Sequence, residues 1–116
     1  LAAGYNTRTR KETHVRMLLR LTFPTARFNE MLKAGQVSPA IQRILEETKP
    51  EAAWFGSETD GMRGAVVVVN IATPDDLPRC TEPWYLAFEA RVETSVAMTP
   101  EEVAGLDLDE IGKAFG

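Results

Sequence analysis

Hydrophobic and polar residues alternate in two segments of the chain, and a period of two is typical of strands with one buried face. In residues 17–23 the apolar set is Met17, Leu19, Leu21 and Phe23. In residues 89–98 the matching set is Ala90, Val92, Thr94, Val96 and Met98. We therefore predict a first strand at 17–23 and a last strand at 89–98, with these sets facing a layer of helices.

Two further strands are predicted in the middle of the chain. Residues 52–55 form a short hydrophobic segment, and residues 64–72 include four consecutive valines. Branched side chains favour strands over helices, and a run that is apolar on both faces as far as Val69 is typical of a central strand. The Asp60-Gly61 pair between the two segments predicts a tight turn.

The spacing of apolar residues predicts helices in the segments that connect these strands. Residues 24–49 repeat apolar positions at intervals of three and four, which predicts one helical layer in two pieces separated at Gly35. A second helical region follows Thr73, with a break or bend expected at Pro83. A capping box at residues 99–102, with Pro100 at the first helical position, predicts a helical tail.

The element order is strand, helix, strand, strand, helix, strand, followed by this tail. That order predicts an α+β protein with a ferredoxin-like β-α-β-β-α-β fold and an antiparallel sheet. Both helical layers then cover one face of the sheet, and the other face is open to solvent or to a partner. We expect a single domain over residues 17–116, preceded by a basic N-terminal arm at 1–16.

The open face of the predicted sheet mixes apolar and charged side chains. We expect Leu18, Val66 and Val68 there, with Trp54 or Phe55 beside them, and such a patch is typical of an interface. Two copies packed through this face would form a dimeric α+β barrel around a partly polar cavity. The candidate polar residues of this face are Arg20, Asn70, Glu89, Arg91 and Glu93.

These charged residues have two interpretations. In the first, Arg20 and Arg91 hold a carboxylate, Asn70 adds a ligand contact, and Glu89 or Glu93 acts as a catalytic base. In the second, the charges form cross-strand ion pairs at a dimer interface, which is the commoner use of such residues.

The string Glu82-Pro83-Trp84-Tyr85 is the second candidate site. Trp84 and Tyr85 can line a small-molecule pocket beside a carboxylate. Large aromatic side chains serve hydrophobic cores equally well, so Trp84 is as readily a core residue.

Charge and composition narrow the range of functions. The first sixteen residues have a net charge of +3, so the remaining hundred carry −7 of the total −4. An acidic body repels phosphate backbones, and we expect no nucleic acid partner. No apolar run approaches the ~18 residues of a membrane span, so no membrane association is expected.

Single residues exclude further chemistry. His14 is the one histidine and lies in the arm, which excludes a histidine-based triad or metal site in the domain. Cys80 is the one cysteine, so no internal disulfide forms, and a reducing cytoplasm fits. Its expected role is that of a small helix residue. The glycines match no phosphate- or dinucleotide-binding fingerprint, and we expect neither a cofactor nor a metal.

Short strings in one order along the chain resemble a family of small bacterial proteins of unknown function. The matching strings are Phe28-Asn29-Glu30, residues 44–53, Asp60-Gly61-x-Arg63-Gly64, Glu82-Pro83-Trp84 and Met98-Thr99-Pro100-Glu101. The resemblance implies membership of the dimeric α+β barrel superfamily, whose members include muconolactone isomerases and small cofactor-poor monooxygenases. It implies a pocket and a homodimer, and no particular reaction.

The sequence therefore predicts a homodimer that binds a small organic molecule through its open sheet face. If Arg20 and Arg91 hold a carboxylate, that molecule is anionic. Isomerisation or proton transfer would be the accompanying activity. The alternative is a non-enzymatic dimerisation or regulatory module, in which the sheet face forms the subunit interface and nothing else.

Overall fold

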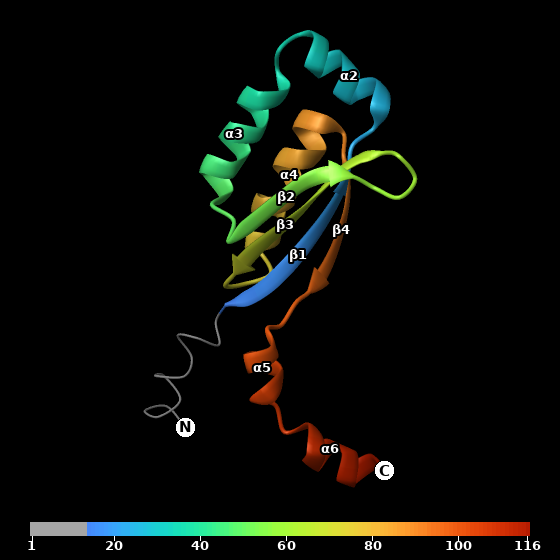
Figure 1. Cartoon of the computed structure of the whole chain (residues 1–116). Coiled ribbons are helices and arrows are strands. Elements are labelled where there is room, and N and C mark those ends of the chain that lie inside the picture. Colours follow the sequence, from blue (N-terminus) through green and yellow to red (C-terminus); the bar gives the residue numbers. More distant parts are fainter. Residues whose placement is uncertain (1–13) are drawn as a thin grey trace.

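The computed structural model describes residues 14–116 (Figure 1). Thirteen residues of the predicted arm lie outside the described residues. Elements along the described chain are β1 (Val15–Thr22), α2 (Thr25–Lys33), α3 (Val37–Thr48), β2 (Ala52–Ser57), β3 (Arg63–Ile71), α4 (Asp76–Phe88), β4 (Arg91–Val96), α5 (Pro100–Ala104) and α6 (Leu108–Phe115). The protein is thus α+β, and β1 begins two residues earlier than the sequence pattern predicts.

The four strands of the described chain form one open antiparallel sheet in the order β2-β3-β1-β4. Strands β1 and β2 run parallel to each other with antiparallel β3 between them, and β3 and β4 run parallel with β1 between them. Each helical connection therefore joins two strands that are not neighbours. The helices α2, α3 and α4 lie on one side of the sheet (Figure 1).

The pairing register fixes which residues share a face. Arg20 lies opposite Val66 on β3 and Glu93 on β4, and Val66 lies opposite Trp54 on β2. Directly paired residues point to the same side of a sheet. These four residues therefore share the open face, as the sequence pattern predicts for the polar set of β1.

The hydrophobic core lies between the other face and the helices. Its largest fully buried side chains are Leu19, Leu21, Phe23, Val67, Val69, Trp84 and Phe88. The Phe23 ring centroid lies 6.2 Å from that of Trp84 and 5.0 Å from that of Phe88. Trp84 and Phe88 are one helical turn apart on α4, so the same face of this helix supplies both rings.

Two predictions for residues 76–91 are wrong, namely a break in the helix at Pro83 and a last strand that begins at Glu89. Helix α4 is unbroken from Asp76 to Phe88 with Pro83 inside it, because burial of Cys80, Trp84 and Phe88 holds the helix on the sheet across the missing N–H donor. The last strand begins at Arg91 and not at Glu89. Glu89 instead ends α4 in a left-handed conformation with φ of 53°.

The tight turn predicted between β2 and β3 is confirmed. Gly61 has φ of +84°, and the backbone N–H of Met62 donates to Asp60 Oδ1 at 2.9 Å. The turn places Glu58 where its N–H donates to the Met62 carbonyl at 2.7 Å. The hairpin thereby brings the residues after β2 back over the end of β3.

The helical tail begins as predicted. The Thr99 hydroxyl accepts from the Glu102 N–H, and the Glu102 carboxylate accepts from the Thr99 N–H, which completes the capping box of α5. Helices α5 and α6 continue beyond the end of the sheet (Figure 1). Against the rest of the described chain, neither helix buries a side chain.

Candidate functional site

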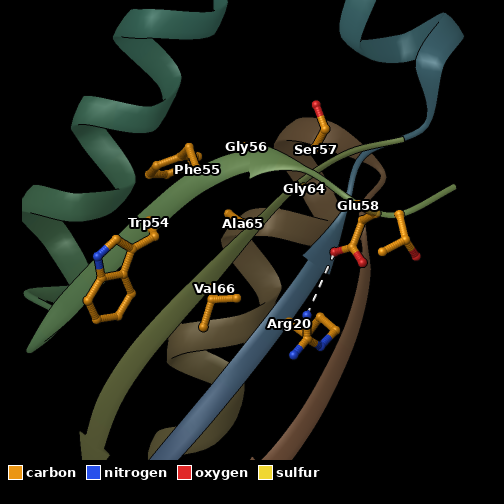
Figure 2. A pocket seen from close by; sticks show the side chains of 10 residues that line it. Arg20, Trp54, Phe55, Gly56, Ser57, Glu58, Gly64, Ala65 and Val66 are labelled. Carbon is orange, nitrogen blue, oxygen red and sulfur yellow. Dashed lines mark ion pairs between the residues drawn. The ribbon is translucent and has the colours of Figure 1, made fainter. Parts of the chain in front are cut away.

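A hollow of about 310 Å³ lies on the open face of the sheet where the β2–β3 hairpin crosses it (Figure 2). Strands β1, β2 and β3 form its floor, and the chain that follows β2 forms one wall. Its polar lining includes Arg20, Ser57, Glu58 and Thr59, and its apolar lining includes Trp54, Phe55 and Val66.

Arg20 and Glu58 are the charged pair of this hollow. Arg20 Nη1 lies 4.0 Å from Glu58 Oε1, and the two side chains reach toward each other from β1 and from the hairpin (Figure 2). Half of the Arg20 side chain is exposed, so its guanidinium has donors free for a further acceptor. An arginine fork of this kind matches the two oxygens of a carboxylate.

Trp54 supplies an aromatic surface on the same face as Arg20 but two strands away, with Val66 between them. It lies on the edge strand β2, directly opposite Val66, and its side chain is 63% exposed. An exposed aromatic and an arginine that lie on one face with Val66 between them suit a ligand that joins a ring or alkyl group to an anionic group.

Gly64 makes this arrangement possible. A Cβ atom at Gly64 would lie 2.6 Å from the Leu21 carbonyl oxygen and 2.8 Å from Glu58 Oε1. Both distances are below ordinary contact, so a side chain at this position would displace the Glu58 carboxylate or part β1 from β3. The absence of a side chain lets Glu58 lie over the strand next to Arg20.

Four of the residues predicted for the site share the open face. Arg20 lies opposite Glu93 on β4. Arg91 lies two residues from Glu93, opposite Thr22, and its Nη2 is 3.9 Å from Glu93 Oε1 and 3.3 Å from Thr22 Oγ1. Asn70 lies at the far end of β3, where its Nδ2 donates to Glu51 Oε1 at 2.9 Å. Arg91, Glu93 and Asn70 do not line the hollow itself.

The other three predicted residues lie elsewhere. Trp84 has an exposed fraction of 0% and belongs to the core on the helical side, so the core interpretation of this residue is the one the structure supports. Tyr85 is on α4, behind the sheet. Glu89 follows α4, and its Oε2 lies 3.8 Å from Arg27 Nε, away from the open face.

Glu58 and Gly64 are site residues that the sequence pattern did not reveal. Glu58 follows the last residue of β2, and its direction depends on how the hairpin crosses the sheet. The Asp60-Gly61 pair predicts a turn but not the path of the residues before it. In the sequence Gly64 looks like any other strand residue. Only its closeness to the Leu21 carbonyl oxygen in the structure shows that a side chain does not fit there.

A second polar cluster lies at the other end of the open face. Arg16 Nε donates to Glu51 Oε1 at 3.0 Å, and Arg16 Nη1 donates to Glu102 Oε1 at 2.5 Å. Hydrogen bonds from Asn70 and then Arg16 hold the pKa of Glu51 below its usual range. The Thr99 backbone N–H, and then Arg16, lower the pKa of Glu102. This cluster keeps both carboxylates ionised and joins α5 to the sheet.

Other reactive groups lie outside both clusters. Burial raises the pKa of the Cys80 thiol, which disfavours the nucleophilic thiolate. In residues 14–116 no three His, Cys, Asp or Glu side chains are grouped so as to hold a metal ion. No helix of that same stretch is long and apolar enough to cross a membrane.

No family model, curated protein or solved structure matches this chain. The resemblance to small bacterial proteins therefore stays a prediction. The function rests on the geometry of the open face.

Proposed function

We propose that the chain is a ferredoxin-like protein that pairs through its open sheet face as a dimeric α+β barrel, and that the hollow at Arg20 binds a small organic carboxylate. The observation that carries the proposal is that the half-exposed Arg20 and the exposed Trp54 line one hollow, on either side of Val66. The all-antiparallel sheet with β3 and β1 in its centre supports the fold assignment.

The dimer is supported by the composition of the open face. Trp54 is exposed on β2, and the partly buried side chains of Leu18 and Val66 lie on the strands beside it. A second copy would cover this apolar surface and turn the hollow from an open depression into an enclosed site. Enclosure excludes water, which strengthens the attraction between Arg20 and a carboxylate.

A proton-transfer activity would use the carboxylates next to Arg20. With the ligand's carboxylate held by the guanidinium, Glu58 would take a proton from a carbon of the ligand and return it to another carbon. Such an isomerisation balances without a further reactant. Glu93, opposite Arg20 on β4, is the other candidate base.

The alternative function is a dimerisation or regulatory module. The observation in its favour is that the charges of the open face have partners within the chain, Arg20 with Glu58 and Arg91 with Glu93. In this version Trp54 anchors the second copy, and the hollow is filled by the partner.

Benzoate is the probe that tests the proposal, because it combines a carboxylate for Arg20 with a ring for Trp54. We expect benzoate to raise the melting temperature of the protein, and Arg20→Ala to weaken its binding ~10-fold or more, as for a lost charged hydrogen bond. Arg79→Ala, which removes an exposed arginine of α4, is the matched control. Equal benzoate affinity in the two variants would favour the module.

A further inference from the structure

The C-terminal arm, which we define as residues 100–116, presents an apolar stripe with no cover from the described part of its own chain. The stripe consists of Val103, Leu106, Leu108, Ile111 and Phe115, of which Phe115 is 88% exposed. Within α6, Leu108, Ile111 and Phe115 are spaced three and four apart and lie on one side of the helix. Asp109, Glu110 and Lys113 lie on the other side.

The first turn of α5, where the arm begins, is tied to the sheet. Arg16 lies opposite Asn70 in the register, on the open face, and its Nη1 donates to Glu102 in the first turn of α5. The capping box fixes the start of α5 at the same point. The arm therefore leaves the sheet from the side of the open face and extends past its end (Figure 1).

The open face alone is small for a stable dimer. Four strands at ~4.8 Å spacing and ~20 Å length have a flat footprint of roughly 400 Å² per copy, and a standard interface buries ~800 Å² of accessible surface per partner. An eight-residue helix adds a footprint of roughly 120 Å². If the two copies exchange their arms, each copy contributes one helix and receives another, so the footprint of the interface rises to roughly 650 Å² per copy before α5 is counted.

We propose that each arm packs on a second copy of this chain, with the stripe of α6 against the β2 rim of the partner's open face at Trp54. Trp54 is the exposed aromatic on that edge strand, and aromatic residues are typical anchors of interfaces. When each copy gives its arm to the other, the two copies are related by a two-fold axis and the assembly stops at a dimer. The arm of one copy then completes the wall of the other copy's hollow.

The groove between α3 and α4 is a different apolar surface, with a volume of about 760 Å³ and an exposed Leu86 at its edge. It lies in the helical layer, behind the sheet. The arm leaves from the opposite side, so the rim at Trp54 is the surface that the exchanged arm can reach when the open faces are paired. The inference thus rests on the face-to-face dimer of the proposed function.

The test compares Ile111→Asp with Lys113→Asp in the full chain. Both variants place an aspartate in α6, the first on the apolar stripe and the second on the opposite side. Sedimentation over a range of concentrations measures the dimer, and iodide quenching of tryptophan fluorescence measures access to Trp54. Trp84 is fully buried and contributes the unquenched fraction.

We expect a dimer with shielded Trp54 in the unmodified chain and in Lys113→Asp. Ile111→Asp should weaken the dimer ~10-fold or more and expose Trp54 to iodide. If the Ile111→Asp dimer is as stable as the unmodified dimer and its Trp54 is as well shielded from iodide, the exchange of arms is wrong. That result would still be consistent with dimerisation through the paired sheet faces. A dimer whose Trp54 is freely quenched would place the arm elsewhere, for example in the α3–α4 groove, and also overturns the proposal.

A monomeric unmodified chain would remove both the exchange and the paired faces. Benzoate binding by that monomer, lost in Arg20→Ala, would still support the ligand site. The two proposals therefore fail in distinguishable ways.

Discussion

Arg16 and Glu102 are 86 positions apart in the chain, and they form an ion pair with 2.5 Å between Nη1 and Oε1. The pair joins the start of the first strand to the first turn of the C-terminal arm. Because Glu102 also closes the capping box with Thr99, one carboxylate both starts α5 and fixes its position against the sheet.

The ion pair predicts that the arm loosens when the charge at position 102 is removed. Glu102→Gln keeps a residue suited to the capping box but loses the charged partner of Arg16. We expect hydrogen exchange of the α5 amides to speed up by up to about five-fold, the range of an exposed ion pair, with the amides of β1 and β3 unchanged. Glu101→Gln, next in sequence and outside the cluster, should leave the exchange rates as they are.

Acid is predicted to weaken this end of the molecule. The folded-state pKa values of Glu51 and Glu102 lie below their usual range, so their contribution to stability is present above the unfolded pKa of ~4.3 and is lost as pH falls through the folded values. Asp76 behaves likewise, because the backbone N–H groups of Ala72 and Thr73 lower its pKa.

Urea unfolding followed from pH 7 downward measures this loss. The free energy of unfolding should be nearly constant down to about pH 5 and fall below it, and Glu51→Gln should make the fall shallower. A stability that rises on acidification would contradict the assigned direction of these pKa shifts.

Gly64 is predicted to tolerate no side chain. Gly64→Ala places a methyl group 2.6 Å from the Leu21 carbonyl oxygen, and the overpacking should cost about 1–3 kcal/mol. Gly56 on β2 pairs directly with Gly64, yet a Cβ there meets nothing within 4 Å. Gly56→Ala is therefore the control, expected within about 0.5 kcal/mol of the unmodified chain by chemical denaturation.

Trp84 is predicted to stabilise the fold rather than to bind ligand. Trp84→Ala should lower the free energy of unfolding by about 3–5 kcal/mol, because it removes a buried ring that packs against both Phe23 and Phe88 and leaves a cavity. Tyr85→Ala, at the exposed neighbouring position, should change it by about 0.5 kcal/mol or less. Similar losses in both variants would contradict the core assignment.

The sequence by itself determined the elements that local patterns specify. Alternation in residues 17–23 predicted which side of β1 is buried, and the register confirms that Arg20 and Thr22 share the open face. The Asp60-Gly61 turn and the capping box at Thr99 were predicted with their geometry, because both depend on interactions between residues two or three apart.

Tertiary structure decided what depends on distant partners. Glu58 meets Arg20 only because the hairpin folds over β3 and Gly64 leaves room for the carboxylate. Glu89 lies off the open face because α4 stays helical through Pro83 as far as Phe88. Packing against the sheet holds the helix together there, although the local preference of proline opposes it. A residue's period in the sequence fixes its side of a strand or helix, whereas its neighbours across the molecule are set by how the whole chain packs.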